Sequence, residues 1–535
     1  MKKDSFEKGA FVATLCIFIT KFLGVLYVIP FYMIITTKGA ALYSYAYNVY
    51  SIFLAISTAG IPLALSKITS EYDAKKMYDA KYRTYKVAMR LIFTISILTF
   101  LVLMIFTPQF AHLIIGDVTG GNTIEDIVIV IRAVAFALLV LPFVSIDRGF
   151  LQGNKYISTA SFSQVVEQIV RIVFLLGGSY LILNVLHLTE TAAIMVAISG
   201  ATIGGIGAFI YLEYIFDKHK KDVFKESTHE DKVTNKEIAK KIIVYAVPFV
   251  IVNVALTVYN FIDIVLVYRT LTGMLNFSAV DTEAIISIYS TWTEKFQRIV
   301  IAVSSGVAVS LIPNIVKHYT MKDNKGVKNT FNKALEIVIF LALPLTFLIS
   351  IYAKDVWYVF YGKNELGPII LTINIYVAFI SALSTTLTSA LQGLNKYKIV
   401  YISILSGVIV NALLDVPIIL LMSKLHIYPY YGAIISSMIG FSVSNIIALA
   451  MAKKECKIDY KPTLQMLLKI SLSVVLLVAS ALILKHFVSY SYDNRFKGLF
   501  MTAIYFIIPL GIYIFLNYKN GIIMDLLKNR SKKVE

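Results

Sequence analysis

Five charged residues inside long apolar segments are our candidates for a functional site, because a charged side chain there is costly unless it has a partner or a task. They are Lys21 in the first segment, Glu167 and Arg171 in the fifth, and Glu294 and Arg298 in the eighth. Lysine and arginine bind phosphate and carboxylate groups through charge-assisted hydrogen bonds. The residue types therefore favour a site for an anionic group within a membrane.

Lys21 lies about ten residues into its segment, which is about 15 Å of helix and near the middle of a ~30 Å hydrocarbon core. A lysine stem is too short to reach the interface comfortably from that depth. We predict that Lys21 faces a water-filled cavity or an acidic partner. The alternative is a lysine that is buried against a carboxylate for packing alone.

Polar residues of the fifth segment share one face of a helix. Gln164, Glu167, Gln168 and Arg171 are separated by three, four and seven positions, which places them on one side. Glu167 and Arg171 are predicted to pair along this helix, and the face is predicted to point into the bundle. Whether it touches substrate or only joins two helices is left open by the sequence.

Other polar residues in apolar segments are candidates for the same cavity. Glu294 and Arg298 are again four positions apart, and Asn253 and Asn411 lie in the seventh and eleventh segments. We interpret the asparagines as interhelical hydrogen-bonding groups, each worth less than about 2 kcal/mol.

The elements that must position these residues are transmembrane helices. Of 535 residues, 58% are hydrophobic and only 15% are charged, whereas about a quarter of a soluble domain is charged. Counting segments of about 20 apolar residues predicts an all-α, polytopic membrane protein with about fourteen helices. The predicted spans are 10–36, 41–66, 87–107, 126–146, 157–183, 191–215, 242–268, 286–316, 331–353, 366–390, 399–423, 430–452, 465–487 and 498–518.

Lysine and arginine gather in alternate loops. The 67–86, 216–241 and 453–464 loops are rich in them, whereas the 108–125 and 184–190 loops have none. Because cytoplasmic loops carry the excess of these residues, the pattern predicts that both termini are cytoplasmic.

One polar hinge occurs twice. Gln152-Gly153, followed by Asn154-Lys155-Tyr156, is matched by Gln392-Gly393, followed by Leu394-Asn395-Lys396-Tyr397. Duplicated halves are typical of secondary transporters. The prediction is a six-helix lobe over 1–215, a basic cytoplasmic linker over 216–241, a second six-helix lobe over 242–452, and two extra helices with a basic tail over 453–535. Both hinges, with Pro30 and Pro62, are candidates for gating because proline bends a transmembrane helix.

Several other classes of protein are excluded by the sequence. The net charge of +18 lies in loops between apolar segments, which is the positive-inside pattern and does not indicate nucleic-acid binding. No GxxxxGK[ST] motif is present, the histidines lack metal-ligand spacing, and no cluster of catalytic carboxylates or histidines occurs. We therefore expect a transporter without an enzymatic activity, a metal site or a cofactor.

A set of motifs in order resembles the MurJ/MviN family, and most closely its Gram-positive YtgP-like branch near stage V sporulation protein B. The motifs are Lys21-Phe22-Leu23-Gly24, Ile29-Pro30-Phe31, Ala41-Leu42-Tyr43, Ser57-Thr58-Ala59-Gly60-Ile61-Pro62-Leu63-Ala64, Ser70-Glu71-Tyr72, Leu151-Gln152-Gly153 and Ser163-Gln164 with Glu167-Gln168 and Arg171. The resemblance covers about 1–450. It implies the multidrug/oligosaccharidyl-lipid/polysaccharide exporter fold and flipping of lipid II, the undecaprenyl-pyrophosphate-linked peptidoglycan precursor, by alternating access in the bacterial cytoplasmic membrane.

The sequence departs from the Gram-negative members of that family. Lys21 stands at the first arginine of their first-span motif, but Tyr27 and Val28 fill the later Arg-Asp positions, and the second span has no arginine. The cations for the pyrophosphate are thus not carried over intact, and Lys21, Arg171 and Arg298 replace them by depth.

Three alternatives differ in how well the sequence supports them. A flippase for another lipid-linked glycan would use the same fold, and the sequence barely distinguishes it. A cation-coupled drug exporter of the same fold predicts an acidic cavity, against which the lysine and arginine at mid-depth argue. A membrane-embedded transferase would need clustered Asp, His or Glu at a membrane surface, and the sequence has no such cluster. The expected partners are a lipid-linked glycan, membrane lipids and proteins of cell-wall synthesis, with the chain acting as a monomer. Transport would draw on the membrane potential or on a coupled cation.

Overall fold

The computed structural model describes residues 6–58, 60–118, 120–223, 232–488 and 494–527. Within these ranges every regular element is a helix and no strand occurs, so the predicted all-α class is confirmed. The chain forms two compact units, Met1–Ser287 and Ile288–Glu535.

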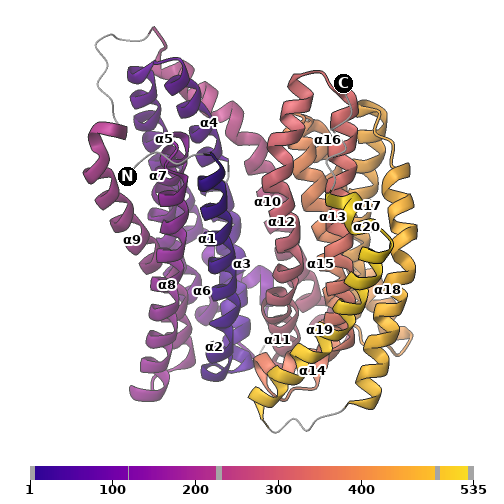
Figure 1. Cartoon of the computed structure of the whole chain (residues 1–535). Helices are drawn as coiled ribbons and strands as arrows, with labels where there is room; N and C mark the ends of the chain where they lie inside the picture. The colour runs from indigo at the N-terminus through magenta and orange to yellow at the C-terminus, as the bar shows by residue number, and fades with distance from the viewer. Residues whose placement is uncertain (1–5, 59, 119, 224–231, 489–493, 528–535) are drawn as a thin grey trace. The chain divides into compact units, whose positions relative to one another are not determined.

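The first unit is a bundle of long helices with two short interruptions (Figure 1). Its helices are α1 (Phe6–Leu26), α2 (Val28–Ile34), α3 (Thr37–Thr58), α4 (Ile61–Ala74), α5 (Tyr78–Ile115), α6 (Ile124–Ala135), the 3-10 helix η1 (Phe136–Leu139), α7 (Leu141–Gly153), α8 (Ile157–Tyr180), the π-helix η2 (Leu181–Val185), α9 (Glu190–Val223), α10 (Asn235–Gly273) and α11 (Ala279–Ser287).

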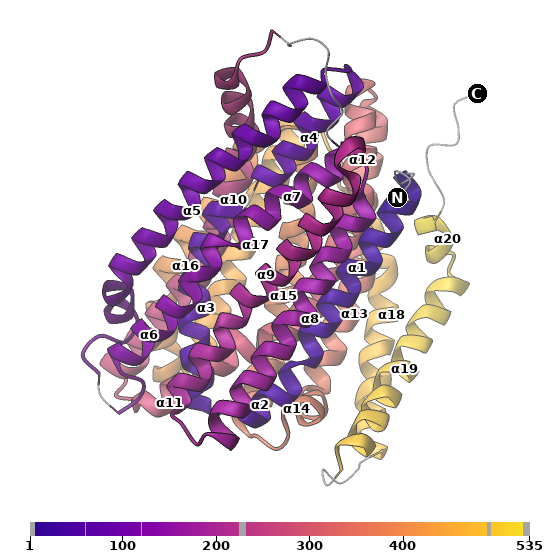
Figure 2. The same ribbon diagram turned by 90° about the vertical axis from the view of Figure 1, so that its left-hand side faces the viewer.

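The second unit begins with the π-helix η3 and ends with two helices packed on its side. Its elements are η3 (Ile288–Trp292), α12 (Thr293–Thr320), α13 (Asn324–Ile351), α14 (Ala353–Tyr361), α15 (Leu366–Gly393), α16 (Tyr397–Lys424), α17 (Tyr431–Cys456), α18 (Lys461–Phe487), α19 (Arg495–Lys519) and α20 (Ile522–Leu527). Helix α18 packs on α13, and α19 packs on α18 and α14 (Figure 2).

Thirteen helical segments in the described ranges are long and apolar enough to cross a membrane. They correspond to thirteen of the predicted spans. The remaining one, 286–316, corresponds to α12, a helix of 28 residues, several of whose side chains lie outside the described residues. The prediction of about fourteen transmembrane helices agrees with this arrangement.

Helix α10 begins within the basic stretch that we predicted as a linker. Helix α9 continues to Val223 and α10 starts at Asn235, so both ends of the 216–241 stretch are helical, while 224–231 lies outside the described residues. Thr234 caps α10 by accepting from the backbone N–H of Glu237, whose carboxylate accepts from the Thr234 N–H. The lobe boundaries inferred from the duplication stay a prediction.

Among the predicted spans, 10–36 and 41–66 are each divided into two α-helices. Pro30 has no N–H to donate to the carbonyl of Leu26, where α1 ends and α2 follows. Gly60 separates α3 from α4 with a φ of +83°, and a Cβ there would lie 2.4 Å from the backbone oxygen of Ala246 on α10. Glycine thus allows both the turn and the close approach of α10.

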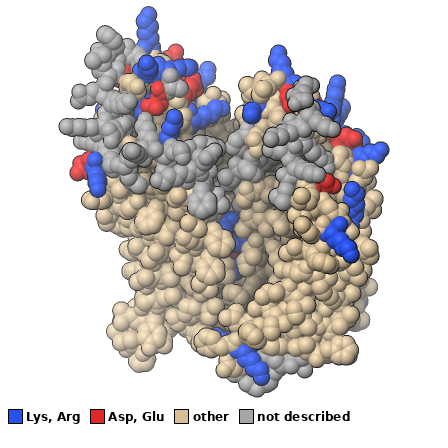
Figure 3. All heavy atoms as spheres, in the orientation of Figure 1, with Lys and Arg blue, Asp and Glu red and all other residues tan. Residues whose placement is uncertain are grey.

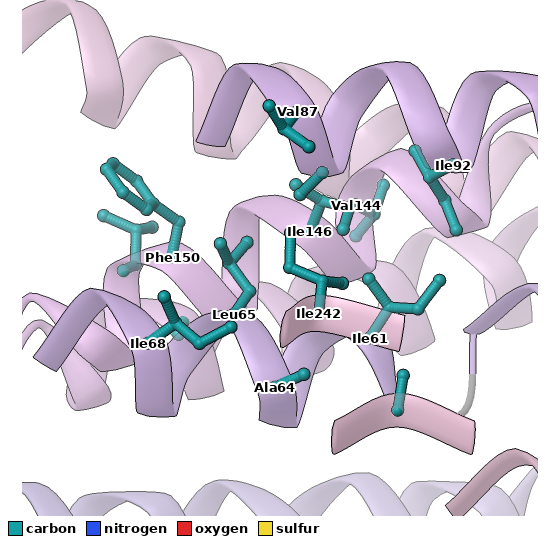
Figure 4. Packing of buried hydrophobic residues seen from close by; sticks show 14 of the residues in the cluster. Ile61, Ala64, Leu65, Ile68, Val87, Ile92, Val144, Ile146, Phe150 and Ile242 are labelled. Atoms are coloured by element: carbon teal, nitrogen blue, oxygen red, sulfur yellow. The ribbon is translucent and has the colours of Figure 1, made fainter. Parts of the chain in front are cut away.

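The core of the first unit lies among α4, α5, α7 and α10 (Figure 4). Leu65 and Ile68 on α4 lie beside Ile146 and Phe150 on α7, and Ile242 of α10 packs into the same cluster. Their period of three to four residues is that of a helix face turned to its neighbours. This packing fixes the position of α7, which carries a residue of the candidate site.

Candidate functional site

Glu167 on α8 forms its ion pair with a neighbouring helix. Its Oε2 accepts a hydrogen bond from Nη2 of Arg148 on α7 at 2.7 Å, with side-chain exposures of 21% and 15%. Arg148 Nε also donates to Ser163 Oγ at 2.7 Å. The guanidinium therefore joins α7 to α8 through two groups one helical turn apart.

Arg171 is held by tyrosines. Its Nη2 donates to the hydroxyl of Tyr43 on α3 at 3.3 Å, and its guanidinium lies 5.8 Å from the ring centre of Tyr47. No carboxylate pairs with Arg171 within the described residues. Phenol and ring contacts hold the guanidinium in place without neutralising its charge.

The predicted Glu167–Arg171 pair along α8 is therefore wrong. Helical spacing permits it, but Arg148 reaches Glu167 from α7, and Arg171 turns toward α3. The polar face contacts a third neighbour as well, because a Cβ on Gly24 of α1 would lie 3.5 Å from Nε2 of Gln168. The prediction that this face points into the helix bundle agrees with these contacts.

Lys21 lies on α1 three residues before Gly24, and its side chain is exposed. Residues three apart share a helix face, so Lys21 is one turn from the contact between α1 and Gln168. The first unit thus brings Lys21, Glu167 and Arg171 to neighbouring parts of α1 and α8. Pro30 of α2 is also exposed.

Arg148 was missed from the sequence because the fourth span was expected to end at 146. The helix α7 continues to Gly153, and the apolar segment covers Ile124–Gly153. Asp147 is likewise inside it and accepts a hydrogen bond from the hydroxyl of Tyr85 at 2.8 Å. The sequence did contain a signal that the helix continues, because Gly149 and Gly153 have the four-residue spacing of a helix-packing face.

Those two glycines bring α4 and α7 into close contact. A Cβ on Gly149 would lie 2.5 Å from the backbone oxygen of Pro62, and one on Gly153 would lie 2.7 Å from the backbone oxygen of Ser66. Ser70 Oγ also donates to the Gly153 carbonyl at 2.9 Å. Pro62 and Gly153 therefore belong to one tight helix contact.

The two predicted hinges fold into the same turn, each in its own unit. The N–H of Lys155 bonds the Gln152 carbonyl and that of Tyr156 bonds the Leu151 carbonyl. The N–H groups of Asn395 and Lys396 make the equivalent bonds to Gln392 and Leu391. Lys155 and Asn395 have φ of +68° and +56°, as in the helix-ending Schellman turn. The same turn ends α4 at Lys76, so it supports the repeat without being specific to it.

The candidate ion pair of the second unit is less enclosed than that of the first. Glu294 and Arg298 pair along α12 at 2.7 Å, with exposures of 28% and 53%. Asn411 on α16 is buried, and Ser436 of α17 donates to its Oδ1 at 3.1 Å, so this asparagine joins two helices as predicted. Gln392 and Gly393 end α15.

Asn253 belongs to α10 of the first unit and is exposed. Its amide donates to the Phe249 carbonyl of its own helix at 2.8 Å. Its printed hydrogen bond is thus within one helix, and the prediction of an interhelical bond for Asn253 is not met.

On the face that Figure 3 shows, most charged side chains gather at one end of each unit, and most of the remaining surface is uncharged. In the first unit this end holds three ion pairs of α4. Lys241–Glu71 at 2.7 Å joins α4 to α10, Lys75–Glu71 at 2.8 Å joins it to the loop that follows it, and Lys81–Asp73 at 2.7 Å joins it to α5. The hydrogen bond to Glu71 raises the pKa of the Lys75 ammonium above its usual value. An uncharged belt with one charged end is the surface expected of a protein in a bilayer.

The chain is similar to a known protein family, to a relative of known name and to a solved structure, which agree with one another. The sequence profile of the family described as polysaccharide biosynthesis protein matches residues 6–276. The lipid II flippase MurJ of Bacillus subtilis is 30% identical over 98% of this chain and 97% of its own length. A solved structure of lipid II flippase MurJ in an inward closed conformation aligns with a TM-score of 0.66 at 15% identity, over 97% of this chain and 100% of that chain.

A second solved structure shares the fold. It is the inward-facing conformation of a multidrug resistance MATE family transporter of the MOP superfamily, with a TM-score of 0.60 at 14% identity over 84% of this chain and 99% of that chain. The fold is therefore common to flippases and drug transporters, and the residues inside it must distinguish them.

Proposed function

Because the chain belongs to the family of polysaccharide biosynthesis proteins that includes the MurJ flippases, we propose that it translocates lipid II from the inner to the outer leaflet of the cytoplasmic membrane. It is a multi-pass membrane transporter of the MOP superfamily and not an enzyme. Its substrate would be a lipid-linked glycan, whose apolar tail can remain in the membrane while the anionic head group crosses.

The observation that carries the proposal is the state of Arg171. Its guanidinium lies in a transmembrane helix and is held by Tyr43 and Tyr47 instead of a carboxylate. A cation that is positioned but not neutralised can bind an anion, and a guanidinium suits the oxygens of a pyrophosphate. Lys21, exposed on the neighbouring helix α1, would supply a second positive charge.

A cation-coupled drug exporter would need the opposite electrostatics, because cationic drugs bind best to acidic cavities. In the first unit, Glu167 is already neutralised by Arg148. The positive side chains thus favour an anionic substrate. A flippase for another lipid-linked glycan would use the same contacts, so the substrate must be established by experiment.

The decisive experiment is rescue of cells depleted of their own lipid II flippase. We expect the parent chain to restore growth. Arg171→Gln should fail, whereas Arg171→Lys, which keeps the charge, should restore part of the activity. Lys21→Ala should also fail at normal protein abundance, because an exposed side chain contributes little to folding.

The matched control is Lys21→Arg, which should retain activity. Growth of the parent without lipid II in the outer leaflet would contradict the proposal. Full activity of Lys21→Ala would remove Lys21 from the mechanism, and loss of the protein itself would indicate the packing role. Failure of the parent with a capsular or teichoic precursor flipped instead would identify another glycan as substrate.

We also propose that both termini are cytoplasmic, as the basic loops indicate. With Cys16 and Cys456 replaced by serine, a membrane-impermeant thiol reagent should label Asp117→Cys and Leu186→Cys from outside, but not Thr228→Cys. The reverse pattern would overturn this orientation.

We further propose a monomer that acts without a bound cofactor, draws on the membrane potential or a coupled cation, and works beside cell-wall synthesis proteins.

A further inference from the structure

At the end of the first unit opposite its ion-pair network, α10 and α11 are fastened to the loop between α5 and α6. Glu283 of α11 accepts a hydrogen bond through Oε1 from the backbone N–H of Asn122 at 2.7 Å. The Asn122 amide donates to the carbonyl of Lys38 on α3 at 3.0 Å. Arg269 of α10 donates through Nε to the Leu113 carbonyl at 3.1 Å. We call the contact of Glu283 with Asn122 the latch.

The other oxygen of the Glu283 carboxyl is buried without a hydrogen-bond partner. Glu283 is 1% exposed and Asn122 is 3% exposed, and both Glu283 Oε2 and Asn122 Oδ1 are unpaired. The hydroxyls of Tyr45 on α3 and Tyr268 on α10 are buried and unpaired as well. Their rings meet edge to face at 6.3 Å.

A buried ionised carboxylate with one hydrogen bond is costly, since unpaired buried polar atoms lose their hydration. A proton on Oε2 removes the charge. It also supplies a hydrogen-bond donor for the buried oxygens of Asn122, Tyr45 and Tyr268, which lack a partner. The charged groups that act on Glu283 are Lys38 of α3, which favours the ionised form, and Asp126 of α6, which opposes it. Neither forms an ion pair with Glu283 within the described residues.

We propose that Glu283 is a protonation site that holds α10 and α11 on the α5–α6 loop when protonated, and that loss of its proton to water opens the latch. In this step the carboxylic O–H bond breaks, the proton passes to the aqueous phase, and the carboxylate becomes hydrated as the contact separates. Under the proposed orientation, this end of the unit faces outside, and external pH would set the equilibrium.

The burial of Glu283 sets the direction in which pH changes the closure of the latch. Burial raises the pKa of Glu283 from 4.5 to about 6 in the closed latch, against hydrogen bonding from Asn122, which lowers it. In an open latch the hydrated carboxyl returns toward 4.5. Closure is thus favoured most below pH ~4.5, and this stabilisation is lost as pH rises through about 6. A difference of 1.5 pH units changes the open-to-closed ratio by at most roughly thirty-fold.

The experiment measures distance between two spin labels in the full chain in lipid nanodiscs. With both native cysteines replaced by serine, labels are placed at Asp117 of the loop and Val280 of α11, which are both exposed. Pulsed electron paramagnetic resonance at pH 4.5, 6 and 7.5 should show a short-distance population that decreases as the pH rises. Glu283→Gln should keep the short distance at every pH.

The matched control is Glu125→Gln, the same change at an exposed residue of α6, which should follow the parent profile. His112 lies 3.3 Å from Asp117, and it is unchanged in Glu283→Gln. A pH response that persists in Glu283→Gln would therefore overturn the proposal. So would a parent with no pH response.

Two further arms keep the test decisive. If Glu283→Gln does not fold, Tyr268→Phe removes one buried oxygen that can accept from the protonated carboxyl, and it should move the midpoint to lower pH. An unchanged midpoint would contradict the role of Glu283. Exchanging sodium for choline at fixed pH should have no effect, and a sodium-dependent distance would replace the proton by a metal cation. Since the readout is a distance, failure here is separate from failure of the flippase assay.

Discussion

The Arg148–Glu167 pair of the first unit and the Glu294–Arg298 pair of the second have the same distance of 2.7 Å and different surroundings. The first joins α7 to α8 and is mostly buried. The second lies along α12, four positions apart, with Arg298 more than half exposed. Ion pairs of equal length therefore contribute unequally to stability. An exposed pair contributes little, whereas breaking a buried pair leaves a buried charge without its partner.

The comparison also shows how the first unit keeps one cation available. Arg148 takes the carboxylate of Glu167, and Arg171, one turn further along α8, is left with phenol groups. If Glu167 paired with Arg171 instead, the charge proposed to bind pyrophosphate would be neutralised. The interhelical pair is thus a structural contact that indirectly preserves the binding charge.

Glu167→Leu should have the largest effect. It leaves the Arg148 guanidinium without its carboxylate, and we expect the free energy of unfolding to fall by about 3–5 kcal/mol. Thermal unfolding of the purified protein measures this. Adding Arg148→Met should restore most of the loss, whereas adding Arg171→Met should not. Rescue by the Arg171 change instead would show that the pair runs along α8.

Gly149→Val should have an intermediate effect. The new side chain would meet the backbone of Pro62, which lies 2.5 Å from the Cβ position, and overpacking of this kind costs about 1–3 kcal/mol. Moving α7 would also shift Arg148 relative to Glu167. Gly177→Ala on α8 is the control, because nothing lies within 4 Å of its Cβ position, and its stability should be unchanged or slightly higher. Equal loss in both variants would contradict the close α4–α7 contact.

Glu294→Gln should have the smallest effect on stability. The pair it disrupts is exposed and intrahelical, and such pairs contribute about 0.3–0.5 kcal/mol. The same unfolding measurement should therefore place it within about 1 kcal/mol of the parent. A loss as large as that of Glu167→Leu would show that the second unit encloses this pair more than its exposure indicates, and would remove the contrast between the two units.

The sequence alone established the class of the protein and its family. Apolar segments of about 20 residues predicted the transmembrane helices, and the motifs around Lys21 and Gln152 indicated the MurJ family, which the relatives confirm. These features are local, since segment length, periodicity and turn residues act within a few positions. The hinge turns at Gly153 and Gly393 were found for the same reason.

The partners of the charged residues were decided by the tertiary structure. Four-residue spacing put Arg171 within reach of Glu167, but the contact of α7 with α8 brought Arg148 to the carboxylate first. The exposure of Asn253 and the burial of Glu283 were likewise decided by the tertiary structure. Which helix lies beside which, and how closely glycines let them approach, depends on residues far apart in the chain. No local pattern contains that information, because an ion pair forms wherever packing leaves opposite charges within reach.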